Sequence, residues 1–174
     1  MKLQLIIEND ILKLLPLEEN DFETLFKVAS DPLIWEQHPN KDRYKSAVFQ
    51  TFFEGAIVSK GAFLILDKRN NTAIGSTRFY NYDEDNKSIF IGYTFYSRSY
   101  WGSQCNAVVK KMMLDYIFQF VDKVYFHIGA QNIRSQKAIE KIGAEKVREV
   151  VVAYHGEPDR LNFEYVIEKQ NWTS

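Results

Sequence analysis

Three strand-like segments follow one another between residues 62 and 96 and are joined only by short polar turns. They run from Ala62 to Asp67, from Ala73 to Tyr82 and from Ser88 to Tyr96. A turn of about five residues joins neighbouring antiparallel strands, because a parallel pair needs a crossover of a dozen residues or more. These segments therefore predict an antiparallel meander, around which the rest of the chain has to be arranged.

The segment from Asn106 to Val121 has the periodicity of an amphipathic helix, and a further strand at 123–130 follows it. That strand is indicated by apolar side chains that alternate with more polar neighbours. A helix that joins two strands indicates one parallel crossover in an otherwise antiparallel sheet. We expect the polar face of this helix to carry Lys110, Lys111, Asp115 and Gln119.

The remaining segments complete a mixed α/β pattern. A first strand is expected at 11–17, helices at 22–29 and 46–59, and a closing hairpin of strands at 145–154 and 161–168. This order is typical of an α/β fold with a mixed, mostly antiparallel seven-stranded sheet and about four helices. The chain has 174 residues, of which 45% are hydrophobic, and no linker or repeat divides it. We therefore expect a single domain over residues 1–174.

Charge and cysteine content exclude several classes of partner. The net charge of -1 gives no bulk electrostatic reason to bind nucleic acid or an anionic membrane. The lone Cys105 and the histidines at 38, 127 and 155 lack the spacing of a metal site, so we expect no metal. Without a signal-peptide pattern or a membrane-spanning apolar run, a cytoplasmic location is expected. The aromatic content of 15% and the terminal hairpin leave room for a sheet-mediated homodimer.

The run from Asn132 to Ala144 has the features of a short helix with a polar start and a glycine end. Asn132 and Ser135 can accept hydrogen bonds from the unpaired N–H groups of a first turn, and Gly143 suits the left-handed position beyond a helix. A second helix start lies at 101–106, after the last strand of the meander. Because helix N-termini favour anions, these two starts could hold one phosphate-bearing cofactor.

Several motifs, taken in order, resemble the GNAT superfamily of acetyl-CoA-dependent N-acetyltransferases, and in particular its ribosomal-protein N-acetyltransferase branch. The resemblance covers nearly the whole chain. It implies an acetyltransferase that uses acetyl-CoA as cosubstrate, with two central strands, at 88–96 and 123–130, that splay apart to admit the pantetheine arm. The motifs are Asp31-Pro32-x-x-Trp35, Gly92-Tyr93, Trp101-Gly102, Asn132-x-x-Ser135, Glu140 to Ala144 and the closing Trp172.

The same resemblance implies which residues hold acetyl-CoA. The loop before the long helix would wrap the pyrophosphate with backbone N–H groups, at the positive end of that helix. Asn132 would reach the pantetheine arm, Ser135 would lie at its thiol end, and the backbone N–H near Phe95 would polarise the thioester carbonyl. The loop comprises Trp101, Gly102, Ser103, Gln104, Cys105, Asn106 and Ala107.

Two departures from the family pattern bear on function. Gln104 stands where the family loop usually has glycine, and it lacks glycine's backbone freedom. Ile139 stands where many members carry the tyrosine that protonates departing CoA, which isoleucine cannot do. Because a thiol pKa of about 8.5 lies close to working pH, an ordered water or Ser135 could take over that step.

The acceptor amine must be neutral when it attacks, and this separates the candidate substrates. Deprotonation at pH 7 needs roughly 4–5 kcal/mol for a lysine side chain but only about 1–1.4 kcal/mol for an α-amino group. His127 and His38 are candidate bases, although each is also explained as an ordinary packed or solvated histidine. We expect transfer to the α-amine of a protein or peptide. The alternatives are a small amine, such as a polyamine, amino sugar or antibiotic, and a noncatalytic CoA-binding module.

Overall fold

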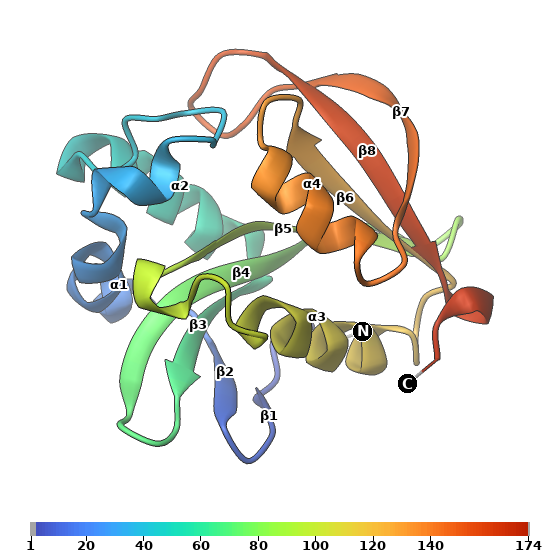
Figure 1. The fold of residues 1–174 in the computed structure, drawn as a ribbon, viewed down its shortest axis with the longest axis horizontal. Helices are drawn as coiled ribbons and strands as arrows, with labels where there is room; N and C mark the ends of the chain where they lie inside the picture. The colour runs from blue at the N-terminus through green and yellow to red at the C-terminus, as the bar shows by residue number, and fades with distance from the viewer. Residues whose placement is uncertain (1–2, 174) are drawn as a thin grey trace.

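One mixed sheet of eight strands organises the computed structural model, which describes residues 3–173 (Figure 1). The strands lie in the order β1-β2-β3-β4-β5-β6-β8-β7, and β5 and β6 form the parallel pair of the sheet. The bounds are β1 Ile7–Glu8, β2 Leu12–Pro16, β3 Ala62–Asp67, β4 Thr72–Asp83, β5 Ser88–Tyr96, β6 Lys123–Gly129, β7 Glu145–Val152 and β8 Arg160–Glu168.

The predicted meander is confirmed as β3, β4 and β5, and the predicted parallel crossover runs from β5 through a helix to β6. The sheet has eight strands instead of the seven predicted, because β1 pairs with β2. Asn9 makes the turn between them, since its Oδ1 accepts the N–H groups of Ile11 (2.8 Å) and Leu12 (2.7 Å). A strand of two residues has no alternation that a sequence pattern could reveal.

Four α-helices within residues 3–173 cover the two faces of the sheet. The first two pack on the face where Leu64 and Phe95 are buried, which we call the α1–α2 face; the other two pack on the opposite face, with Phe63 and Ile65, which we call the α3–α4 face. Figure 1 shows α4 lying over β6. None of the helices described is long and apolar enough to cross a membrane. The α-helices are α1 Phe22–Ala29, α2 Ser46–Ser59, α3 Cys105–Ile117 and α4 Ile133–Glu140, and short 3-10 turns span Glu19–Asp21, Pro32–Trp35, Arg98–Tyr100 and Lys169–Asn171.

The run that begins at Asn132 forms the predicted capped helix, α4. Asn132 Oδ1 accepts the backbone N–H of Ser135 at 3.2 Å, and Gly143 adopts a φ of 91° beyond the end of the helix. Gln136 donates from its side chain to the carbonyl groups of Gly129 (3.1 Å) and of the next residue (3.0 Å), at the end of β6. These contacts fix the start of α4 against the end of that strand.

Lys110 lies on the buried side of α3, contrary to the sequence prediction. Its exposed fraction is 3%, whereas Lys111 is exposed and pairs with Asp115 at 2.8 Å, as expected of the polar face. The buried side of α3 is wide: it includes Val109, Met113 and Leu114. Lys110 falls within the arc that these residues cover, one position from Val109 and four from Leu114.

A buried ion pair joins two loops that are far apart in the sequence. Arg43, between α1 and α2, contacts Glu157, between β7 and β8, through two hydrogen bonds of 2.9 Å. The two side chains are 4% and 6% exposed, and the guanidinium lies 4.8 Å from the ring centre of Phe52. This pair holds the β7–β8 loop against α2.

Replacing Glu157 by Gln should lower the free energy of unfolding by about 3 kcal/mol, because Arg43 keeps a buried charge without a partner. For a chain of 174 residues, this corresponds to a Tm roughly 6–12 °C lower, measured by calorimetry. The exposed pair of Asp42 and Lys45 provides the control, and Asp42→Asn should shift the Tm by less than about 3 °C. A wild-type Tm for Glu157→Gln would contradict the role given to the pair.

Candidate functional site

β5 and β6 pair over only three residues and then diverge. Ser88–Phe90 align with Lys123–Tyr125 in parallel register, and along residues 3–173 no further pair of these strands follows. Beyond that point β5 keeps β4 as its neighbour and β6 keeps β8, so their inner edges have no partner strand. We call this place the β5–β6 opening, and it confirms the predicted splay. Backbone N–H and C=O groups at such edges can bind an extended ligand as an added strand would.

A β-bulge in β5 lies beside this opening. The register with β4 shifts by one residue between Gly92 and Phe95, and Tyr93 adopts a φ of 53°. A tyrosine rarely adopts this left-handed conformation, and such bulges re-aim side chains next to active sites. The ring of Tyr93 lies 3.9 Å from the guanidinium of Arg78, on the α1–α2 face. Phe95, beyond the bulge, is 2% exposed and packs 4.8 Å from the Trp35 ring.

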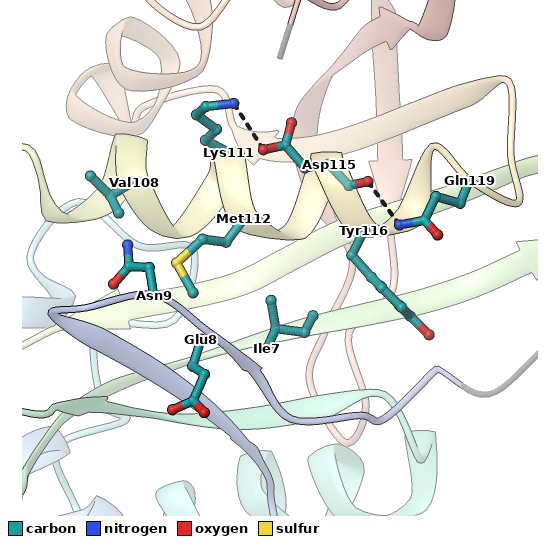
Figure 2. A pocket seen from close by; sticks show the side chains of 9 residues that line it. All are labelled: Ile7, Glu8, Asn9, Val108, Lys111, Met112, Asp115, Tyr116 and Gln119. Atoms are coloured by element: carbon teal, nitrogen blue, oxygen red, sulfur yellow. Dashed lines mark hydrogen bonds and ion pairs between the residues drawn. The ribbon is translucent and has the colours of Figure 1, made fainter.

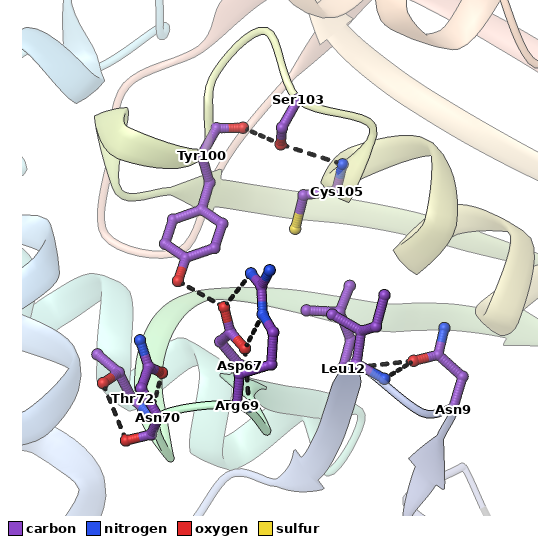
Figure 3. A network of polar contacts seen from close by, with 10 residues as sticks. Asn9, Leu12, Asp67, Arg69, Asn70, Thr72, Tyr100, Ser103 and Cys105 are labelled. Atoms are coloured by element: carbon purple, nitrogen blue, oxygen red, sulfur yellow. Dashed lines mark hydrogen bonds and ion pairs between the residues drawn. The ribbon is translucent and has the colours of Figure 1, made fainter.

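The loop before α3 is anchored to the turn after β3 (Figure 3). Tyr100 donates a hydrogen bond to Asp67 at 2.8 Å, and Arg69 binds the same carboxylate through its guanidinium. The hydrogen bond from Arg69 outweighs the effect of burial and, with that from Tyr100, holds the pKa of Asp67 well below its usual range. Ser103 accepts the N–H of Cys105 at 3.2 Å, at the start of α3. These contacts fix the backbone of the predicted cofactor loop.

Gly102, and not position 104, needs the conformational freedom of glycine in this loop. Gly102 has a φ of 71°, whereas Gln104 has an ordinary φ of -78°. A Cβ at Gly102 would meet no atom within 4 Å, so the requirement is conformational and not steric. Gln104 therefore causes no backbone strain. Gly102, Ser103, Gln104 and Ala107 are exposed, and Trp101 and Asn106 are half-buried.

Cys105 is the buried member of the loop. Burial and, to a smaller extent, the nearby Asp67 raise the pKa of its thiol to about 11. The thiol is therefore protonated at neutral pH, which argues against a nucleophilic role.

Arg134 connects α4 with the loop, a role that the sequence analysis missed. Its guanidinium lies 3.8 Å from the ring centre of Trp101 and donates to the carbonyl of Ile34 at 3.3 Å. Its backbone N–H donates to Gln37 at 3.2 Å. The only sequence signal was its position inside the Asn132-x-x-Ser135 motif. The stack brings the two predicted cofactor segments, at 101–107 and at the start of α4, into contact.

His127 has a carboxylate partner on the neighbouring strand. Its Nε2 lies 2.9 Å from Oε2 of Glu164, and its Nδ1 is buried with no hydrogen-bond partner among residues 3–173. Burial tends to raise the pKa of Glu164, but hydrogen bonds from Arg148 and His127 outweigh burial and lower it. An ionised Glu164 holds the proton on Nε2 and leaves Nδ1 as an acceptor. The ring lies 4.5 Å from Phe90, the last β5 residue paired with β6.

His38 lies in less favourable surroundings for proton transfer. Its half-buried ring packs 5.0 Å from that of Trp35. Burial, followed by the charges of Arg43 and Arg134, lowers the pKa of His38 to about 3. A group this far from neutral pH is a weak proton acceptor.

The two remaining positions of interest lie on α4. Ser135 is half-buried in the first turn, next to the Asn132 cap. Ile139 is 4% exposed and packs in the core of the α3–α4 face. This part of the helix therefore contributes a hydroxyl group at its start and apolar packing further along.

Lys110 approaches the bulge from the α3–α4 face. Its Nζ donates to Thr94 Oγ1 at 2.7 Å and to Thr77 Oγ1 at 3.4 Å. Burial lowers the pKa of Lys110 to about 7. By these contacts Lys110 lies next to the bulge in β5, beside the β5–β6 opening.

A pocket of about 480 Å³ lies elsewhere, between β1 and the outer side of α3 (Figure 2). None of the residues predicted for cofactor binding or catalysis lines it. Among residues 3–173 there is also no group of three or more His, Cys, Asp or Glu side chains that could hold a metal ion. The pocket is lined by Ile7, Glu8, Asn9, Val108, Lys111, Met112, Asp115, Tyr116 and Gln119.

Known structures share this fold. A GCN5-related N-acetyltransferase from Brucella melitensis has a TM-score of 0.82 at 17% identity, covering 97% of this chain and 80% of that one. Spermidine N-acetyltransferase from Vibrio cholerae, solved with CoA and spermine, has a TM-score of 0.70 at 15% identity, covering 94% and 98%. A protein assigned as a ribosomal-protein-serine acetyltransferase from Vibrio cholerae has a TM-score of 0.73 at 14% identity, covering 97% and 99%.

The splayed sheet and its two flanking helix starts are thus a fold shared with these structures, and the family comparison is more specific. The family profile described as an acetyltransferase (GNAT) domain matches residues 12–145. A comparison with curated protein sequences gives no match. The chain belongs to the GNAT family of acetyl-CoA-dependent N-acetyltransferases, as its motifs predicted.

The stability of the protein should rise between about pH 7 and pH 9. Lys110 has a pKa of about 7 in the folded protein and of about 10.4 in an unfolded chain. Between these values the unfolded state binds more protons, so the free energy of unfolding increases with pH.

Lys110→Met should lack this rise and should have a higher Tm than the wild type at pH 7, because no ammonium group is buried. Calorimetry of both proteins across this pH range measures the difference. Parallel pH dependences would contradict the assignment to Lys110.

Proposed function

We propose that this enzyme transfers the acetyl group of acetyl-CoA to the α-amino group of a protein or peptide. The observation that carries the proposal is the charge balance on the α1–α2 face. Two carboxylates that are largely buried there already have cationic partners: Glu157 pairs with Arg43, and Glu164 with Arg148, while His127 also hydrogen-bonds Glu164. A polyamine needs carboxylates that are free to pair with its ammonium groups, whereas an acceptor with a single neutral amine does not.

Aromatic contacts connect these charged groups with the β5–β6 opening. Arg78 lies on the same face, is 4% exposed and donates to main-chain carbonyls of α2, and no carboxylate among residues 3–173 pairs with it. An acceptor that approaches from this face therefore meets aromatic surface and excess positive charge. Consecutive rings lie 4.5–5.6 Å apart from His127 through Phe90, Tyr80 and Tyr93 to Tyr154.

The residues around the opening fit acetyl-CoA. In the reaction, the thioester supplies the acetyl group: the amine nitrogen forms the new N–C bond, the C–S bond breaks, and the sulfur leaves with the electron pair. The exposed backbone around Gly102, before α3, would hold the pyrophosphate. The inner strand edges, with Asn132 and Ser135, suit the amide-rich pantetheine arm. The N–H near Phe95 would polarise the thioester carbonyl.

We assign His127 as the general base. Its Nδ1 has no other partner in the described chain, and Glu164 would stabilise the imidazolium that forms when it takes the amine proton. The low pKa of His38, about 3, makes that histidine the weaker candidate. Ile139 offers no proton to the departing thiolate, so Ser135 or an ordered water supplies it. This step demands little, because a thiol pKa of about 8.5 is near working pH.

The choice of acceptor is tested by thiol release across matched amines. Acetyl-CoA should raise the Tm, and a peptide with a free α-amine should react faster than the same peptide with a blocked N-terminus and a free lysine. A preference for spermidine or an amino sugar would favour a small-molecule enzyme. Binding without turnover of any amine would favour a noncatalytic CoA-binding module.

His127→Gln should lower kcat for the preferred amine by roughly 10²–10⁴-fold, the usual contribution of a general base. The KM for acetyl-CoA should change little, because the base acts on the amine. His38→Gln is the matched control and should keep kcat within about threefold of the wild type. The reverse order of effects would transfer the role of base to His38.

A further inference from the structure

α3 carries one charged side chain into the core of the α3–α4 face. Lys110 is 3% exposed, and within residues 3–173 no Asp or Glu pairs with it. Its neighbours in the helix, Val109 and Met113, are fully buried apolar residues. An ammonium group in such surroundings has a large desolvation cost that a methionine of similar length would not have. Buried ionisable groups of this kind concentrate at functional sites.

The contacts of Lys110 lead to the backbone beside the β5–β6 opening. Its Nζ donates to Thr94 Oγ1 at 2.7 Å, and Thr94 lies between the bulged Tyr93 and Phe95. Thr77, on β4, lies 2.8 Å from Thr94 by its hydroxyl oxygen and 3.4 Å from the lysine nitrogen. The ammonium therefore lies beneath both strands at the bulge, on the face that α4 also covers.

We propose that Lys110 is a positioning residue that places a positive charge beneath the reacting thioester and acts through the hydroxyl group of Thr94. This inference rests on the proposed acetyl-CoA site at the opening. Negative charge develops on the carbonyl oxygen as the N–C bond forms and passes to sulfur as the C–S bond breaks. A fixed cation in an interior of low dielectric constant stabilises both charges without reorganisation.

Lys110 acts in its protonated form, which its pKa of about 7 leaves substantially populated up to neutral pH, and it exchanges no proton with the substrates. The amine proton passes to His127, and the thiolate receives its proton from Ser135 or water, so no proton needs to enter or leave the core. The role differs from that of the family tyrosine at position 139, which donates a proton. With Ile139 in that place, the positive charge of protonated Lys110 lowers the need for a strong acid, because it stabilises the thiolate directly.

The test compares Lys110→Met with the wild type. We expect kcat to fall at least about tenfold, somewhat less than the 10²–10³-fold loss typical of a direct oxyanion donor. The KM for acetyl-CoA should stay within about twofold, and the Tm should not fall, because the substitution removes a buried charge. Lys111→Met, in the next residue of the same helix and exposed, is the matched control and should leave all three quantities unchanged.

Thr94→Val is the second variant, since valine keeps the shape of threonine without the hydroxyl group. It should also lower kcat, and the double variant should be no slower than the slower single variant, because the two residues act as one unit. If Lys110→Met does not fold, Thr94→Val decides the matter alone. A wild-type kcat for Thr94→Val would then overturn the proposal.

The outcomes separate this inference from the proposed function. Wild-type turnover of an amine together with unchanged kcat in Lys110→Met would overturn the role of Lys110 and leave the proposed function standing. A raised KM together with a lower Tm would make Lys110 a structural residue and would also overturn it. If the wild type acetylates none of the amines tested, kcat is measured instead for the slow hydrolysis of acetyl-CoA, in the wild type and in Lys110→Met. A wild-type protein that does not bind acetyl-CoA would overturn both proposals.

Discussion

The early end of the pairing between β5 and β6 is the constraint on which the rest of the structure depends. The ladder stops after Phe90 and Tyr125, and the inner edges of both strands then lack partners. Unpaired backbone groups in an interior cost free energy, which favours closing the gap by pairing the two strands. Other elements therefore have to keep the strands apart. β4 and β8 hold them laterally. Gln136 hydrogen-bonds the end of β6. Pro39 packs closely on the same end: a Cβ added at Gly129 would lie 3.0 Å from the Pro39 ring.

The two faces of the opening differ in whether their buried charged groups have partners of opposite charge. On the α1–α2 face, ion pairs with Arg43 and Arg148 neutralise the carboxylates Glu157 and Glu164. This leaves a histidine with an oriented ring and a surface without free negative charge, which suits the removal of one proton from one amine. On the α3–α4 face, Lys110 has only neutral hydroxyl partners. In the proposed reaction, the amine would lose its proton on the first face, and negative charge on the acyl group would develop above the second.

The sequence predicted the parts of the fold whose signals are local. The meander, the four α-helices and the cap at Asn132 follow from periodicity and from single side chains, so they could be recognised before the structure. β1 is too short to have a period. Gln104 looked unfavourable because the family usually has glycine at this position, which suggested a backbone conformation that only glycine adopts easily. Its φ of -78° is an ordinary one, so no such conformation is needed. The pair of Arg43 and Glu157 bridges 114 positions, and no local pattern contains such information.

The candidate site was predictable to the same extent and for the same reason. The segments proposed to bind the cofactor lie at helix starts and carry local signals, whereas the partner of His127 depends on the register between β6 and β8, which places Glu164 opposite it. Lys110 was misplaced because a polar residue was assumed to face solvent. Ile139 and Lys110 belong to the two helices on one side of the opening, and each reverses the expected polarity: an apolar residue replaces a proton donor, and a cation replaces core packing. The two substitutions of polarity are linked if protonated Lys110 supplies the stabilisation of the thiolate that a proton donor at position 139 would have given.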